Sequence, residues 1–252
     1  MTIDEFFKSH PHTAVALSGG VDSAWLLHEA ARCCQRTAAY YVRTAFQQTG
    51  ELEDAQKTAE LLGVPLRIVE VDALADPAVA ENPKDRCYYC KKNILSAILT
   101  AAEKDDFETV AEGSNASDDA GDRPGMLALR ELGVRSPLRD CGITKAQIRE
   151  NARKAGLPVW DKPSCACLAT RVPAGTRITR EDLQRVDRGE QKLHSMGFGD
   201  LRLRLRGERG LLQLPAEDHP RALAQMEEIR RALAPDFVQV ELDPVPRPSR
   251  ET

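Results

Sequence analysis

The sequence has no long apolar run, no basic leader and no excess of positive charge. No apolar stretch approaches the ~20 residues that a membrane-spanning helix needs. Residues 1–10 lack the basic start and apolar centre of a signal peptide. The 252 residues carry a formal net charge of −4, which gives no general attraction to nucleic acid. We therefore expect a cytoplasmic chain that spans no membrane and binds no nucleic acid.

Cysteine is too scarce for a disulfide scaffold, since a chain of this length contains only seven. In a reducing compartment, clustered cysteines more often bind metal or react. Cys33, Cys34 and Cys141 lie in or beside helical, partly apolar patterns. We interpret these three as small core residues. The other four fall into two clusters.

The usual glycine-rich phosphate motifs, Gly-Lys-Ser/Thr and GxGxxG, are also absent. Instead, the apolar run Ala14–Leu17 stops at a glycine turn, and a helical pattern begins at Val21. This order predicts a strand, a turn and a helix whose N-terminus can bind an anion. A tight turn that binds nothing is the alternative. The residues that we expect to face a phosphate are Ser18, Gly19, Gly20, Asp22 and Ser23.

The region after the first helix predicts an α/β fold. A strand over Thr37–Arg43, a helix over Glu51–Leu62 and a strand over Leu66–Val71 continue the order β-α-β-α-β. This order is typical of a doubly wound parallel sheet, which binds ligands at the carboxyl ends of its strands. The Ser18 turn lies at such an end. Further along, Thr144 and Gln147 form a capping box at the start of another helix.

A polar loop follows a further predicted strand, Thr109–Glu112. Its carboxyl and amide groups could hold Mg²⁺ or a ribose, and a solvated acidic loop is the open alternative. The residues concerned are Asn115, Asp118, Asp119 and Asp122, with Arg123 next to them.

Two cysteine pairs indicate metal or sulfur chemistry. Cys87 and Cys90 are three residues apart at a predicted helix start, where both thiolates can point the same way. A CxxC pair alone is shared by zinc sites, redox pairs and iron–sulfur clusters. Cys165 and Cys167 lie between Lys162 and Arg171, basic neighbours that favour thiolate. Together the two pairs offer up to four soft metal ligands.

The pattern changes beyond Pro173 and predicts a smaller α+β domain. We assign residues 1–175 to the α/β domain, 176–243 to the small domain and 244–252 to a proline-rich, disordered tail. The small domain is expected to contain helices over Thr179–Met196 and Ala216–Leu233. Its strand DLRLRLR places Arg202, Arg204 and Arg206 on one face. That face is either solvated or an anion site.

Four motifs together resemble one known family. SGGVDS at Ser18–Ser23 resembles the PP-loop of ATP pyrophosphatases. With the later motifs, the chain from Phe6 to Leu242 resembles the LarE family of PP-loop sulfur transferases, which act in nickel-pincer nucleotide biosynthesis. The later motifs are NPKDRCYYCKK at Asn82–Lys92, DRPG at Asp122–Gly125 and WDKPSCACLATR at Trp160–Arg171.

The resemblance implies an enzyme that adenylates a pyridinium carboxylate mononucleotide with ATP and Mg²⁺ and releases pyrophosphate. Sulfur then reaches the activated carboxyl group and gives a thiocarboxylate and AMP. Catalytic roles fall on Asp22 and Ser23. The ATP-binding positions are Ser18, Gly19, Gly20, Asp22, Ser23, Asp122 and Arg123.

The family supplies sulfur in two ways. Some members sacrifice a cysteine, and Ala166 stands at that position here. Others hold a [4Fe-4S] cluster on three cysteines, and Cys87, Cys90 and Cys167 match those positions. We therefore favour the cluster, with sulfide or cysteine-derived sulfur as donor and Cys167 at the reacting centre. Cys165, beside the aligned position, keeps the sacrificial route open.

The resemblance also implies that Glu190, Arg202 and Arg204 bind the substrate and that the protein is a homo-oligomer. Two alternatives remain. A PP-loop tRNA thiolase is disfavoured by the net charge of −4 and by the lack of a basic RNA-binding extension. A non-enzymatic ATP-binding protein with a structural zinc site would instead explain the cysteines without sulfur transfer.

Overall fold

The computed structural model describes residues 1–118, 123–163 and 166–248. The described chain forms two compact units. The N-terminal unit contains residues 1–44, 50–73 and the described part of 85–163, and the C-terminal unit contains 45–49, 74–84 and 166–248. A single cut after residue 175 does not reproduce these units, because the segments 45–49 and 74–84 contact the C-terminal unit.

The N-terminal unit is built on a four-stranded parallel sheet with the strand order β3-β2-β1-β4. The strands are β1 (His12–Ala16), β2 (Arg36–Arg43), β3 (Leu66–Glu70) and β4 (Thr109–Ala111). Successive strand residues point to opposite faces. Val15 and Tyr41 therefore belong to one buried cluster, and Ala14 and Tyr40 to the other.

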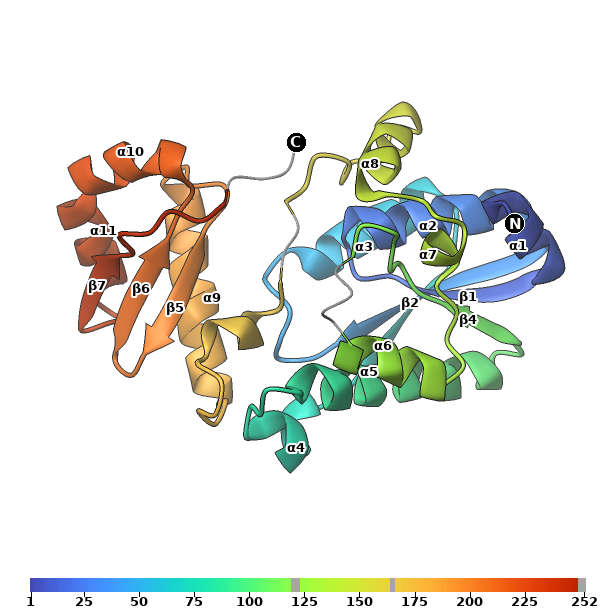
Figure 1. The fold of residues 1–252 in the computed structure, drawn as a ribbon, viewed down its shortest axis with the longest axis horizontal. Helices are drawn as coiled ribbons and strands as arrows, with labels where there is room; N and C mark the ends of the chain where they lie inside the picture. Colours follow the sequence, from blue (N-terminus) through green and yellow to red (C-terminus); the bar gives the residue numbers. More distant parts are fainter. Residues whose placement is uncertain (119–122, 164–165, 249–252) are drawn as a thin grey trace. The chain divides into compact units, whose positions relative to one another are not determined.

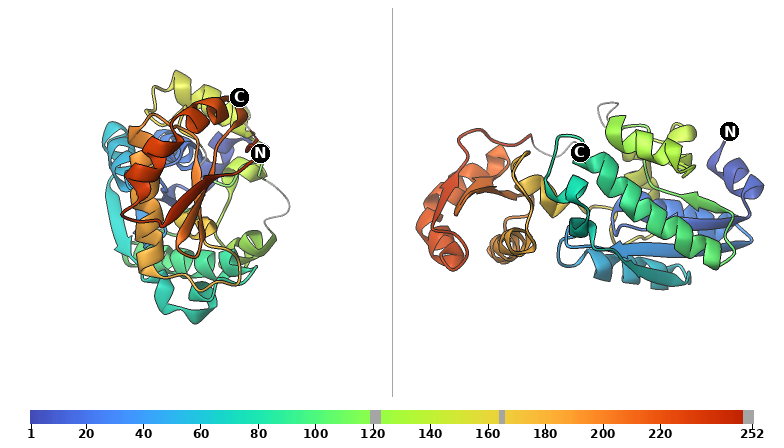
Figure 2. Two further views of the ribbon diagram at one scale, coloured as in Figure 1. Left: turned by 90° about the vertical axis from the view of Figure 1, so that its left-hand side faces the viewer. Right: turned by 90° about the horizontal axis from the view of Figure 1, so that it is seen from below.

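Helices cover both faces of this sheet, which confirms the predicted doubly wound α/β fold (Figures 1 and 2). Residues of α1, α2, α3 and α8 pack on one face, and residues of α5 and α6 on the other. The helices are α1 (Ile3–Ser9), α2 (Val21–Cys33), α3 (Glu51–Leu61), α5 (Arg86–Lys104), α6 (Arg123–Glu131), α7 (Pro137–Asp140) and α8 (Lys145–Lys154). The predicted capping box at the start of α8 is present, with Thr144 and Gln147 bonded reciprocally.

The C-terminal unit is a small α+β structure, as expected. Strand β5 (Arg202–Arg206) pairs antiparallel with β6 (Arg209–Gln213), which pairs parallel with β7 (Gln239–Leu242). Gly189 of α9 lies so close to the sheet that a Cβ there would stand 2.5 Å from Leu203 Cδ2. The helices are α4 (Pro77–Ala80), α9 (Arg180–Ser195), α10 (His219–Ala224) and α11 (Met226–Leu233), with short 3-10 helices η1 (Ala73–Ala75), η2 (Leu168–Arg171) and η3 (Ala216–Asp218).

The prediction of one helix over Ala216–Leu233 is wrong, because this segment forms η3, α10 and α11. Gln225 separates the last two with φ −100° and ψ 10°. Pro220 lies in the first turn of α10, where a missing N–H is tolerated. Among the described residues, no helix has the length and apolar character needed to cross a membrane.

Part of the segment assigned to a disordered tail bonds to the C-terminal unit. The backbone N–H of Arg247 donates to the Leu214 carbonyl at 2.9 Å, and Pro215 and Arg247 form an isolated parallel bridge. The backbone N–H of Val245 donates to Asp243 Oδ1 at 3.1 Å. The expectation for residues 249–252 lies outside the described residues.

Candidate functional site

The turn after β1 is closed by its own hydroxyl groups. Ser23 Oγ accepts from the Ser18 backbone N–H at 3.1 Å, donates to the Gly20 carbonyl at 3.0 Å and lies 3.1 Å from Ser18 Oγ. Gly19 has φ +77°, and a Cβ there would lie 2.4 Å from the Glu51 carbonyl oxygen. Only glycine fits this position without displacing the backbone of α3.

The first turn of α2 is open to an anion. Gly20 is its N-cap residue and provides no side-chain cap, so the orphan N–H groups of the helix start remain available. Gly113, after β4, lies against this turn, since a Cβ there would stand 2.9 Å from the Ser23 backbone nitrogen. The ends of β1 and β4 therefore meet at the helix start.

Asp22 is held from two elements distant in sequence. Its Oδ1 accepts from Asn115 Nδ2 at 3.3 Å, and its Oδ2 pairs with Lys145 Nζ at 2.5 Å. Asn115 is buried and bonds to Asp118 through both its backbone and its side-chain amide. The structure thus brings Asp22 together with two residues of the predicted polar loop.

A second ammonium group borders the same turn. Lys162 Nζ donates to the Gly19 carbonyl at 3.3 Å and pairs with Asp54 Oδ2 at 2.5 Å. No sequence signal connects either lysine to this turn, because Lys162 lies beside the cysteines and Lys145 in a capped helix. Two ammonium groups, each paired with a carboxylate, thus lie beside the uncapped helix start.

Four of the predicted site residues cannot be placed in this way. Asp119, Asp122 and Cys165 lie outside the described residues. Arg123 begins α6, but its side chain is not described.

Cys87 and Cys90 are the second and fifth residues of α5, at the helix start that the sequence predicts. Cys87 is exposed, and the buried Arg86 donates Nη2 to its Sγ at 3.6 Å. Cys167 is the N-cap of η2 and belongs to the C-terminal unit. All three are free thiols, and cysteine thiolates are the ligands that hold iron–sulfur clusters in proteins.

Cys33 and Cys34 are core residues, as interpreted from the sequence, whereas Cys141 is partly buried and belongs to no described core cluster. Cys33 and Cys34 pack against the buried cluster around α2. Burial raises the pKa of Cys34 to about 11 and also raises the pKa of Cys33 and of Cys141. These thiols stay protonated near neutral pH.

One further cluster has the composition of a metal site. Ligand atoms of Asp4, Glu29 and Cys33 lie within 4.8 Å of one another. Arg32 pairs with both carboxylates, with Nη2 2.7 Å from Glu29 Oε2. The guanidinium already supplies the positive charge, so these contacts explain the cluster as an ion-pair network.

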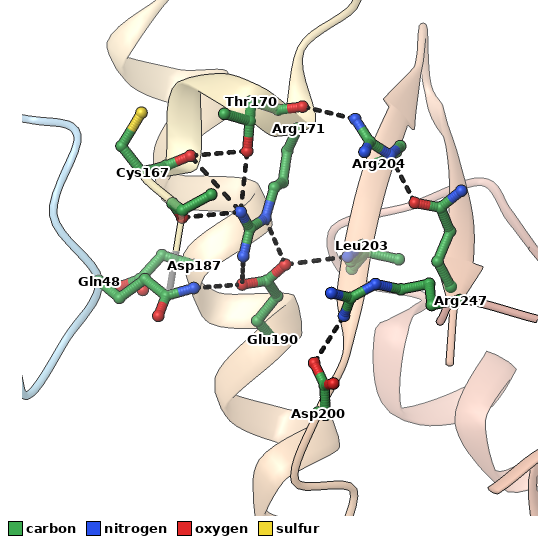
Figure 3. A network of polar contacts seen from close by, with 12 residues as sticks. Gln48, Cys167, Thr170, Arg171, Asp187, Glu190, Asp200, Leu203, Arg204 and Arg247 are labelled. Carbon is green, nitrogen blue, oxygen red and sulfur yellow. Dashed lines mark hydrogen bonds and ion pairs between the residues drawn. The ribbon is translucent and has the colours of Figure 1, made fainter. Parts of the chain in front are cut away.

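In the C-terminal unit, Glu190 and Arg171 form a fully buried ion pair (Figure 3). Arg171 Nε and Nη2 donate to Glu190 Oε1 and Oε2 at 2.8 and 3.0 Å. The Leu203 backbone N–H and Gln48 Nε2 donate to the same carboxylate at 2.9 and 2.8 Å. Four donors thus satisfy the Glu190 carboxylate. These hydrogen bonds offset much of the free-energy cost of desolvating the buried pair.

Arg171 connects this pair to the segment that carries Cys167. Its Nη1 donates to the Ala166 carbonyl at 2.8 Å and to Thr170 Oγ1 at 2.9 Å. Glu190 also accepts from Leu203, which lies between Arg202 and Arg204 in β5. The buried pair therefore fixes the cysteine segment relative to the arginine face of β5.

The arginine face of β5 carries uncompensated positive charge. Arg204 donates Nε to Gln213 Oε1 at 2.5 Å and Nη1 to the Thr170 carbonyl at 2.7 Å, both neutral acceptors. Within the described part of the chain, the guanidinium of Arg202 has no hydrogen-bond or ion-pair partner. Burial, then the charges of Arg171 and Arg247, lower the pKa of Arg202 to about 10, and burial and Arg171 lower the pKa of Arg204. Such a face favours an anion over plain solvation.

No family model matches the chain. The chain is 36% identical over 84% of its length to an uncharacterized protein of Synechocystis sp., 80% of which is covered. It is 30% identical over 85% of its length to the pyridinium-3,5-bisthiocarboxylic acid mononucleotide synthase of Lactiplantibacillus plantarum, 78% of which is covered.

A third relative is more distant. The tRNA-specific 2-thiouridylase MnmA of Frankia alni is 29% identical over 59% of the chain, which covers 52% of that enzyme. PP-loop enzymes as a class use ATP and Mg²⁺. Fold, motifs and relatives agree. The chain belongs to the LarE family of PP-loop sulfur transferases, the family of pyridinium-3,5-bisthiocarboxylic acid mononucleotide synthase, and is an enzyme of this kind.

Proposed function

We propose that this enzyme uses ATP and Mg²⁺ to adenylate the carboxyl group of a pyridinium carboxylate mononucleotide and converts it to a thiocarboxylate. The observation that carries the adenylation step is the convergence of Lys145 and Lys162 on the uncapped helix start that also presents Asp22. The Lactiplantibacillus plantarum relative, by its name, makes a bisthiocarboxylic acid mononucleotide, which supports the substrate class.

The PP-loop residues have separate tasks in this step. The backbone N–H groups after Gly20 bind the phosphates of ATP, and Asp22 offers carboxylate oxygens to Mg²⁺. Lys145 and Lys162 stabilise the negative charge that builds on the departing pyrophosphate. Ser23 stabilises the backbone conformation of the turn through the hydrogen bonds of its hydroxyl group to Ser18 and Gly20. Asp122 and Arg123 remain proposed ATP ligands.

For sulfur supply we propose that Cys87, Cys90 and Cys167 hold a [4Fe-4S] cluster. A cluster with three protein ligands provides one iron at which sulfide can bind. Arg171 holds the segment of Cys167 by its bonds to Ala166 and Thr170. The sacrificial alternative places the consumed sulfur at Cys165, and the zinc alternative predicts no sulfur transfer.

For substrate binding we propose that Arg202 and Arg204 take the phosphate of the mononucleotide. Arg202 has no protein acceptor among the described residues, and the fork of donors on arginine suits phosphate. Glu190 contributes by position, because protein donors already occupy its carboxylate. The homo-oligomer implied by the family resemblance stays a prediction.

Pyrophosphate release tests the proposal. The purified chain is mixed with ATP, Mg²⁺ and nicotinic acid mononucleotide, a pyridinium carboxylate mononucleotide, and release is followed with a coupled assay. Asp22→Asn should abolish most release, while Asp140→Asn, the same change at an exposed residue of α7, should leave it intact. Normal release from a folded Asp22→Asn variant would contradict the adenylation step.

A further inference from the structure

The segment after β7 brings a fourth arginine to the arginine face of β5. The backbone N–H of Arg247 fixes this segment beside Leu214. Arg247 lies far along the chain from Arg202 and Arg204, yet its charge contributes to lowering the pKa of both. Figure 3 shows the Arg247 side chain running across β5, with its guanidinium between Leu203 and Asp200.

The Arg247 side chain is largely buried but only partly used. It is 17% exposed, and its Nη1 donates to Asp200 Oδ1 at 2.6 Å. That is its one side-chain bond among the described residues, so most donors of the guanidinium remain available. A well-buried arginine with spare donors, beside other arginines, is suited to an anionic ligand.

The charges around this face match one class of ligand. Glu190 compensates Arg171, and Asp200 compensates Arg247. The side-chain nitrogens of Arg202 and Arg204 have no carboxylate bonded to them among the described residues. Two uncompensated guanidinium groups match a phosphomonoester, which carries about −1.5 to −2 charges at pH 7.

We propose that Arg247 is a third guanidinium of the phosphate-binding site formed with Arg202 and Arg204. This inference rests on the proposed function, because it takes the phosphomonoester to be that of the mononucleotide. The C-terminal segment then determines specificity for a phosphorylated over an unphosphorylated nucleoside.

A purely anchoring role for Arg247 makes a different prediction. The segment is already held by the backbone bonds of Asp243 to Leu212 and of Arg247 to Leu214, which do not involve the guanidinium. If the guanidinium served only to anchor the segment, it would act through its bond to Asp200. Loss of either partner would then have the same effect.

The test measures binding of nicotinic acid mononucleotide and of nicotinic acid riboside by calorimetry. We expect Arg247→Ala to weaken binding of the mononucleotide about tenfold or more, as for loss of a charged hydrogen bond, and to leave riboside binding unchanged. Arg247→Lys should recover part of the loss. Arg231→Ala removes an exposed arginine of α11 that has no bonded partner among the described residues, and should change neither affinity.

Asp200→Asn separates the two roles. It should retain tight binding of the mononucleotide, because Arg247 remains in place and gains a free donor. Equal losses in Asp200→Asn and Arg247→Ala would refute the inference in favour of anchoring. A loss in Arg202→Ala but none in Arg247→Ala would refute it and leave the proposed function standing. If neither arginine variant weakened binding, the proposed phosphate site itself would be wrong.

Discussion

Replacing Arg202 should make the protein more stable and less able to bind its substrate. Arg202 is partly buried and has no acceptor among the described residues, and its pKa is lowered to about 10 by burial and by Arg171 and Arg247. The charged form is therefore less favourable in the folded protein than in the unfolded chain. Arg202→Met keeps an unbranched apolar stem and removes the charge.

The size of the effect follows from that lowered pKa. Lowering the pKa by one unit corresponds to about 1.4 kcal/mol. The unfavourable interaction of the Arg202 charge with its surroundings therefore amounts to about 3 kcal/mol before solvent screening. Because the guanidinium is only partly buried, we expect about 1–2 kcal/mol of added stability for Arg202→Met. In a domain of this size that raises the melting temperature by a few degrees, about 2–4 °C per kcal/mol.

The assay is thermal unfolding with and without nicotinic acid mononucleotide. The wild-type melting temperature should rise with the ligand, because a ligand that binds only the folded state stabilises it. Arg202→Met should melt higher than wild type without ligand and show little further rise with it. Arg231→Met is the matched control and should keep the ligand response. A lower melting temperature for Arg202→Met with an unchanged ligand response would refute the reasoning.

Three further predictions concern the loop, the buried pair and the cysteines. Gly19→Ala should lose pyrophosphate release, because its Cβ would meet the backbone of α3. The control is Gly63→Ala, which should keep release, since φ is also positive there but no atom lies within 4 Å of the added Cβ. Equal losses in the two variants would contradict the close approach of Gly19 to α3. Glu190→Ala should lower the free energy of unfolding by about 3–5 kcal/mol in denaturant, because it leaves a buried charge unpaired; a loss below ~1 kcal/mol would contradict that. Cys167→Ala should lose iron from anaerobically purified protein while Cys34→Ala keeps it. A dehydroalanine at Cys165, found by mass spectrometry after turnover, would instead favour the sacrificial route.

Local sequence rules predicted the elements that carry the site. The apolar run ending at Ser18 predicted the strand and the glycine turn, because only glycine tolerates that backbone conformation and close approach. The capping box at Thr144 and the placement of Cys87 and Cys90 at the start of α5 also follow from patterns a few residues long. The period of two in β5 predicted that Arg202 and Arg204 share a face.

Contacts between distant segments were decided only by the tertiary structure. Lys162 reaches the carbonyl of Gly19 across 143 positions, and Lys145 reaches Asp22 across 123. A lysine in a loop or at a helix start carries no sequence signal for its partner, because the partner depends on how the helices pack on the sheet. The sequence therefore determined the glycine turn after β1 and the arginine face of β5. The fold decided which cations border the turn, that Glu190 is buried against Arg171, and that Arg247 joins the arginines of β5.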